Sequence, residues 1–194
     1  MTEAEALRDL GMLLLKDART MTLFLLLIMA AVIDVRSYRI PNWLNASGAT
    51  LGLAFCIGVP AAAPHGIWWS LQGLLTGLVL MLPLYALRVT GAGDAKLMAV
   101  VGLFLGAGGV LQACLISLVV GGVLAVGYGF LHGALGQLMQ NLKVFLWTAA
   151  ASIATGARVR VQVDQATSIG RLPLAVSIAL GTIGYVLAVH FGLP

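Results

Sequence analysis

Long apolar runs, interrupted by short polar or glycine-rich clusters, dominate the chain. A helix that crosses a bilayer upright needs about 20 mainly apolar residues. The runs predict about six spans, which cover residues 21–34, 43–62, 68–88, 95–106, 110–131 and 173–190. The first run is shorter than a full span, so its helix is expected to include flanking residues. The fourth run is too short to cross the bilayer by itself. The pattern predicts an all-α, polytopic transmembrane helical bundle.

Polar segments mark the edges of the predicted bundle. Residues 36–41 end the first run, because Pro41 cannot continue a helix and restrains the residue before it. Residues 1–19 mix charged and apolar positions and predict an amphipathic helix on the membrane surface. Residues 133–170 are more polar and are expected to form a cytoplasmic loop. The whole chain, residues 1–194, is expected to be a single integral membrane domain.

The composition agrees with a membrane protein. Hydrophobic residues make up 60% of the chain and charged residues 9%, whereas soluble domains have about 25% charged residues. The net charge is +4, but the basic residues lie dispersed at the ends of apolar runs, which argues against nucleic-acid binding. Lys and Arg concentrate on the cytoplasmic side of membrane proteins. Alternating crossings place these basic groups on one face, which is expected to be cytoplasmic: Arg36 and Arg39; Arg88 and Lys96; Lys143, Arg158, Arg160 and Arg171.

Two aspartates interrupt the apolar pattern and are the candidate functional residues. Asp34 ends the first run, and Asp94 follows the glycine-rich stretch before the fourth run. Ionisable groups at the hydrocarbon boundary are costly, so they indicate function by default. Both acids fall at the cytoplasmic ends of their runs. We therefore expect them at one depth, although they are far apart in sequence.

A pair of carboxyl groups suits peptide hydrolysis. An ionised group takes a proton from water while a protonated partner donates to the carbonyl oxygen. Two carboxyl groups brought close cannot both ionise cheaply, so their pKa values separate and supply both states. Gly91 and Gly93 tolerate conformations that other residues avoid, which would let an extended substrate backbone lie against them. The structural alternatives are that Asp94 only caps a helix and that Asp34 only ends a span.

No metal site or cofactor is expected from the sequence. Cys56 and Cys114 are too few for a tetracysteine zinc site, and both lie within apolar runs, where a disulfide between them is not expected. The histidines lie at different span ends, and no second ligand stands at ligand spacing from any of them: His65, His132 and His190.

Three segments resemble the type IV prepilin peptidases, which are membrane aspartyl proteases with a GxGD motif. They are Asp34 with Arg39-Ile40-Pro41-Asn42; Gly91-Ala92-Gly93-Asp94-Ala95-Lys96-Leu97, with Gly102 and Gly106 following; and, more weakly, Leu172-Pro173 with Ile178-Ala179-Leu180-Gly181. The resemblance covers most of residues 20–190. It is closest to the short form of the family, which is associated with Flp-type (tight adherence) pili.

The resemblance implies a leader peptidase of a bacterial inner membrane, with Asp34 and Asp94 as its catalytic pair. Its substrate would be a prepilin or pseudopilin, cut between a basic leader and an apolar helix at the cytoplasmic face. The expected motif and substrate-approach residues are Gly91, Gly93, Lys96, Arg39, Pro41 and Asn42. Lys96 is expected to snorkel or to contact lipid phosphate, so membrane lipids are the other expected partner.

Two departures from the family pattern limit what the resemblance implies. Long members carry a tetracysteine segment and methylate the new N-terminus. This chain has no place for that segment, so neither methylation nor S-adenosylmethionine is expected. Pro173-Leu174-Ala175 stands where the family usually continues Pro-Tyr-Gly, which leaves any substrate contact of this stretch open.

Two other classes of function fit the sequence. The first is a transporter or channel subunit in which the aspartates bind a cation or relay protons. Its acids would be expected near the midplane of the bilayer, whereas these lie at one edge. The second is an assembly scaffold with an inactive site. Cleavage of a prepilin separates both alternatives from a peptidase.

Overall fold

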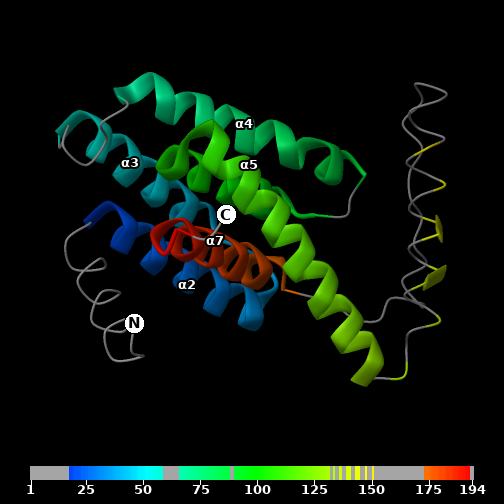
Figure 1. The fold of residues 1–194 in the computed structure, drawn as a ribbon. Helices are drawn as coiled ribbons and strands as arrows, with labels where there is room; N and C mark the ends of the chain where they lie inside the picture. The colour runs from blue at the N-terminus through cyan, green and yellow to red at the C-terminus, as the bar shows by residue number, and fades with distance from the viewer. Residues whose placement is uncertain are drawn as a thin grey trace, which may run out of the picture.

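The computed structural model describes residues 18–58, 66–87, 90–131 and 173–192, with isolated residues between 133 and 150. Its helices are α2 (Ala18–Ser37), α3 (Asn42–Gly58), α4 (Gly66–Ala86), α5 (Ala92–Leu131) and α7 (Leu174–His190). The described part is all helical, as predicted, and forms one bundle (Figure 1). The predicted surface helix at residues 1–19 lies almost wholly outside the described residues, as does most of the predicted loop at 133–170.

The prediction of about six membrane spans is not supported. Three of the described helices, α2, α4 and α5, are long and apolar enough to cross a membrane, and α7 is a shorter apolar helix. The spans predicted at 95–106 and 110–131 belong to one 40-residue element, α5. The helix is kinked at Gly106, whose backbone is not helical (φ 71°, ψ 179°). Glycine reaches this conformation without steric cost, so a single residue replaces the turn predicted at 106–109.

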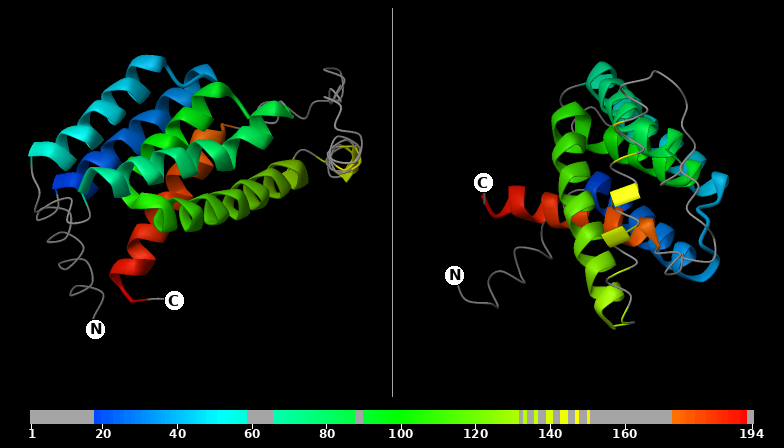
Figure 2. Two further views of the ribbon diagram at one scale, coloured as in Figure 1. Left: turned by 90° about the horizontal axis from the view of Figure 1, so that it is seen from above. Right: turned by 90° about the vertical axis from the view of Figure 1, so that its right-hand side faces the viewer.

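Gly106 divides α5 into a first arm, residues 92–105, and a second arm, residues 107–131. The first arm packs antiparallel to α4, because Gly77 lies against Met98 while Gly73 lies against Gly102. The absence of a side chain at such positions lets membrane helices approach until their backbones touch. α7 lies against α2 and α5 (Figure 2).

The first arm of α5 is the centre of the bundle. Met98, Val101 and Leu103 are fully buried there, and they share a core with Leu27 of α2 and Ile178 of α7. A helix that is apolar on every side is typical of a position surrounded by other helices or lipid. The end of this arm that carries Asp94 is therefore held by the best-packed part of the molecule.

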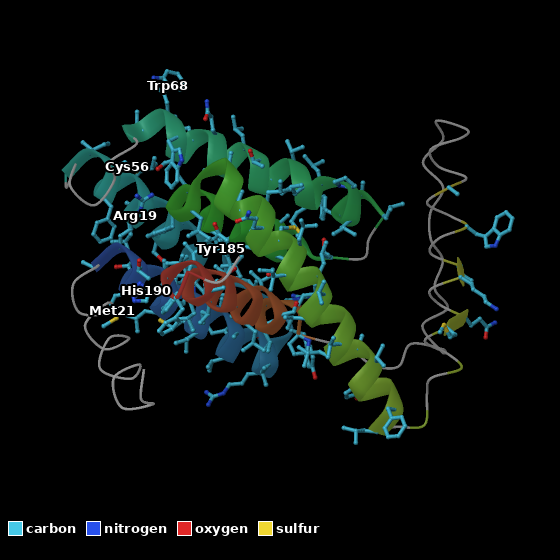
Figure 3. The ribbon with its side chains drawn as sticks, viewed as in Figure 1. Arg19, Met21, Cys56, Trp68, Tyr185 and His190 are labelled. Carbon is cyan, nitrogen blue, oxygen red and sulfur yellow. The ribbon has the colours of Figure 1, made fainter. Side chains whose placement is uncertain are left out.

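Arg19 is a buried cation at the opposite end of the first arm. Its Nη2 donates to the carbonyl oxygen of Leu103 at 2.9 Å, close to the break at Gly106. The guanidinium of Arg19, which is labelled in Figure 3, lies 5.3 Å from the ring centroid of Trp69 and 5.9 Å from that of Phe104. The last carbonyls of a helix lack helical donors, and a cation complements the dipole there. Arg19 therefore caps the first arm where Gly106 interrupts the helix.

Replacing Arg19 by leucine is expected to lower the free energy of unfolding by about 2–3 kcal/mol, because a buried carbonyl loses a charged donor. Thermal unfolding in detergent micelles measures the change. Arg36→Leu is the matched control, since Arg36 is exposed on the same helix and should change stability little. Equal melting temperatures for the two variants would contradict the capping role of Arg19.

Candidate functional site

Asp34 lies near the end of α2 and is 5% exposed. Its Oδ2 accepts a hydrogen bond from the backbone N–H of Ala175 at 2.9 Å. Ala175 is in the first turn of α7, whose N-cap residue, Pro173, makes no side-chain capping hydrogen bond. A carboxylate is stabilising at a helix N-terminus, where N–H groups lack helical acceptors. Asp34 therefore caps α7 from a distant part of the chain.

The turn after Asp34 closes α2 with a left-handed residue. Tyr38 has φ 50° and donates its N–H to the carbonyl oxygen of Asp34 at 2.8 Å. This is the hydrogen bond of an αL helix C-terminus, which usually uses glycine. The chain then reaches Ile40, whose atoms lie against Gly93. The turn between α2 and α3, which follows Asp34, therefore packs against the residue that precedes Asp94.

Asp94 lies in the first turn of α5 and is 8% exposed. Its Oδ2 accepts from the N–H of Gly91 at 2.9 Å, and its own N–H donates to the Gly91 carbonyl at 3.1 Å. This reciprocal arrangement is like the capping box, in which the third helical residue reaches back to the residue before the helix. Asp94 thus does take part in capping, and α5 starts at Ala92, before the predicted apolar run.

The structure brings the two acids together. Asp34 and Asp94 are both buried, and the segments that carry them are in contact, because Ile40 of the turn after α2 lies against Gly93. Their helices run antiparallel, since Arg19 of α2 reaches Leu103 at the far end of the first arm of α5. The end of α2, the start of α5 and the start of α7 therefore meet at one end of the bundle, opposite the break at Gly106.

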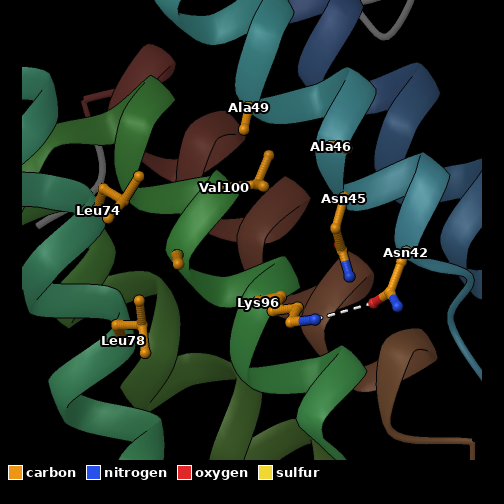
Figure 4. Close-up of a pocket in the computed structure, with 9 residues that line it drawn as sticks. Asn42, Asn45, Ala46, Ala49, Leu74, Leu78, Lys96 and Val100 are labelled. Atoms are coloured by element: carbon orange, nitrogen blue, oxygen red, sulfur yellow. Dashed lines mark hydrogen bonds between the residues drawn. The ribbon is translucent and has the colours of Figure 1, made fainter.

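Two side-chain contacts join the start of α3 to the start of α5. Lys96 Nζ donates to Asn42 Oδ1 at 2.9 Å (Figure 4), and Asn45 Nδ2 donates to the carbonyl oxygen of Gly93 at 3.2 Å. Lys96 contacts Asn42 through this bond while its side chain stays exposed, and the snorkelling or phosphate-contacting role expected from the sequence stays a prediction. The bond from Asn45 holds the residue immediately before Asp94.

The remaining predicted site residues lie on the connecting turn. Arg39 is exposed, and its carbonyl accepts from Ser37 Oγ at 3.0 Å. The carbonyl of Pro41 accepts from the N–H of Leu44 at 3.2 Å, at the start of α3. Neither side chain reaches the acids by a described hydrogen bond, so their expected contribution is to shape the turn.

Sequence reasoning missed Ala175 and Asn45. Pro173 marks a helix start, where proline is favoured, and could have placed Ala175 in a first turn with a free N–H. Asn45 stands three residues after Asn42 and so shares its helix face. Within the described residues, no group of three or more His, Cys, Asp or Glu could hold a metal ion. Cys56 and Cys114 are free and buried.

Substituting Gly93 by alanine tests the contact between the start of α5 and Ile40 in the turn between α2 and α3. A Cβ there would lie 3.0 Å from Ile40 Cβ and 3.3 Å from its carbonyl oxygen, so one segment must move by a few tenths of an ångström. Small displacements of a catalytic group are costly. In an assay of the leader cleavage that the family resemblance implies, we expect kcat/KM to fall about tenfold. Gly108→Ala is the control, because a Cβ there meets nothing within 4 Å. Unchanged kcat/KM in Gly93→Ala would show that this contact does not position Asp94.

Comparison with known proteins identifies the family of the chain. A model of the type IV leader peptidase family matches residues 21–126, which is more than half of the chain and includes Asp34 and Asp94. No curated protein and no solved structure matches the chain. The long apolar helices identify a membrane protein. By the extent of the family match, the chain belongs to the type IV leader peptidase family, which is a family of proteases.

Proposed function

We propose that the chain is an aspartyl endopeptidase of a bacterial inner membrane that removes the leader of type IV, Flp-like prepilins or pseudopilins. The observation that carries the proposal is the burial of Asp34 and Asp94 at one end of the bundle, on contacting segments that lie within the match to the family. Two neighbouring carboxyl groups supply the general base and the general acid that peptide hydrolysis needs.

The reaction uses one water molecule between the acids. The ionised carboxylate takes a proton from water, and the oxygen of that water adds to the scissile carbonyl carbon. The protonated partner donates to the carbonyl oxygen. When the gem-diol intermediate collapses, the C–N bond breaks, the acid that took the proton from water gives it to the leaving amine, and the other acid takes a proton back from a hydroxyl of the intermediate. The backbone bonds from Ala175 and Gly91 hold Oδ2 of each acid, which leaves Oδ1 of each for water and substrate.

Charge supports a cytoplasmic position for the acids. Arg36, Arg39 and Lys96 lie on the same helix ends and turn as the acids, and basic residues favour the cytoplasmic side. A substrate would then present its leader at this face, with its apolar helix in the bilayer. N-methylation is not part of the proposal, because the chain has no segment comparable to the tetracysteine insertion of the long members.

Cleavage by the purified protein tests the proposal. The enzyme, in lipid nanodiscs, is mixed with a prepilin that has a short basic leader followed by an apolar helix. Mass spectrometry should detect the free leader and a product that starts at the boundary with the helix. A substrate that stays intact would refute the peptidase. It would instead favour the transporter or the inactive scaffold.

A further inference from the structure

A groove opens beside the acids, between α3, α4 and the first arm of α5. Its volume is about 360 Å³, which is within the range of ligand pockets. Its walls are small or aliphatic, with Ala46 and Ala49 from α3, Leu74 from α4, and Ala99 and Val100 from α5 (Figure 4). The residues from α3 and from α5 recur at helical spacing, so each helix turns one continuous face toward the groove.

The groove becomes polar at the end near the acids. Asn42, Asn45 and Lys96 line it there, and the bond from Asn45 to the Gly93 carbonyl places this end beside Asp94. Asn45 is 5% exposed, and its Oδ1 has no hydrogen-bond partner among the described residues. A buried acceptor without a donor is costly and rare. The oxygen is enclosed in this structure, so a donor from a ligand in the groove would reach it after the Asn45 side chain turns toward the groove.

We propose that this groove binds the first turns of the substrate's apolar helix, just after the scissile bond. The inference rests on the proposed function and adds to it the surface that positions the substrate. The helix would lie with its N-terminus at Asn45 and its apolar side chains between Ala49, Leu74 and Val100. Its scissile bond would then lie at the end of the groove where Asp94 stands.

The chemistry of the groove favours a peptide helix over a lipid chain. The first turn of a helix carries N–H groups without helical acceptors, and these are the donors that Asn45 Oδ1 lacks. An acyl chain has no such donor. The alanines at positions 46, 49 and 99 leave room for a close approach by another helix, as small residues do between membrane helices.

Filling the groove tests the inference by kinetics. Ala49→Leu should raise KM for prepilin cleavage by about tenfold, because an enlarged side chain occupies the space of a substrate side chain, and kcat should change little. Ala54→Leu is the matched control, since Ala54 is exposed on the same helix and does not line the groove. Its KM should equal that of the wild type. Equal KM values in Ala49→Leu and Ala54→Leu would overturn the inference.

Photo-crosslinking tests it independently of turnover. A benzophenone amino acid replaces Ala46 in the uncleaving Asp94→Asn background, and the control carries it in place of Ala54. An adduct with prepilin from position 46, and not from position 54, supports the inference. An adduct with lipid alone at position 46 overturns it.

Wild-type cleavage is measured in parallel. If the wild type cuts prepilin but the groove results fail, only the docking surface is wrong, whereas an uncut substrate refutes the peptidase and the groove's role with it.

Discussion

Asp34→Asn and Asp94→Asn should each reduce leader cleavage by about a thousandfold or more, so that the precursor stays uncut in co-expression and with purified protein. The loss of a general acid or base usually costs between about 10²- and 10⁴-fold. Asparagine neither takes up nor releases a proton at the pH of the assay. Each substitution therefore removes either the general acid or the general base. Normal cleavage in either variant would refute the two-acid mechanism.

Asparagine is the informative replacement because it keeps the structural role of each acid. Its side-chain oxygen can still accept from the N–H of Ala175 or of Gly91, and asparagine caps helices as well as aspartate does. Melting temperatures near the wild-type value are therefore expected. Asp34→Ala, by contrast, should also lose about 1 kcal/mol of stability with the cap of α7. Asp164→Asn controls for general loss of acidic charge, since Asp164 lies outside both motifs.

Much of the bundle follows from apolar runs alone. α2, α4 and α7 lie close to the runs that predict them, and α2 extends beyond residues 21–34 at both ends because its flanks complete the span. The count of spans fails at α5. A run of glycines predicts a turn, but sequence cannot tell a loop of several residues from a break at Gly106 alone.

The acids could be predicted from sequence, and their surroundings could not. Asp34 and Asp94 stand out because a charge in an apolar chain needs a reason. The contact of Asp34 with Ala175 joins residues 141 positions apart. Its donor is a backbone N–H, which almost every residue type has, so the sequence does not reveal it. Asn45 is equally unremarkable until packing places it beside Gly93. Tertiary contacts of this kind decide how a motif is held, whereas the motif itself is local.

Gly73→Ala and Gly102→Ala are expected to destabilise the bundle strongly, because α4 and the first arm of α5 are in backbone contact there. A Cβ on Gly73 would overlap the carbonyl oxygen of Gly102, and a Cβ on Gly102 would overlap that of Gly73. Backbone atoms cannot rotate away as side chains do, so α4 and the first arm of α5 must separate. Overpacking of a core costs about 1–3 kcal/mol and occasionally more, and a backbone clash falls at the upper end.

Because the first arm carries Asp94, the same substitutions should also lower cleavage. Thermal unfolding in micelles and prepilin cleavage are measured together for Gly73→Ala, Gly102→Ala and the control Gly122→Ala. Gly122 is in the second arm of α5, where a Cβ meets nothing within 4 Å. There alanine should leave stability unchanged or raise it by up to about 1 kcal/mol, as its higher helix propensity predicts. Equal melting temperatures for all three variants would show that α4 and α5 are not packed backbone against backbone. The first arm would then not be held where it brings Asp94 to Asp34.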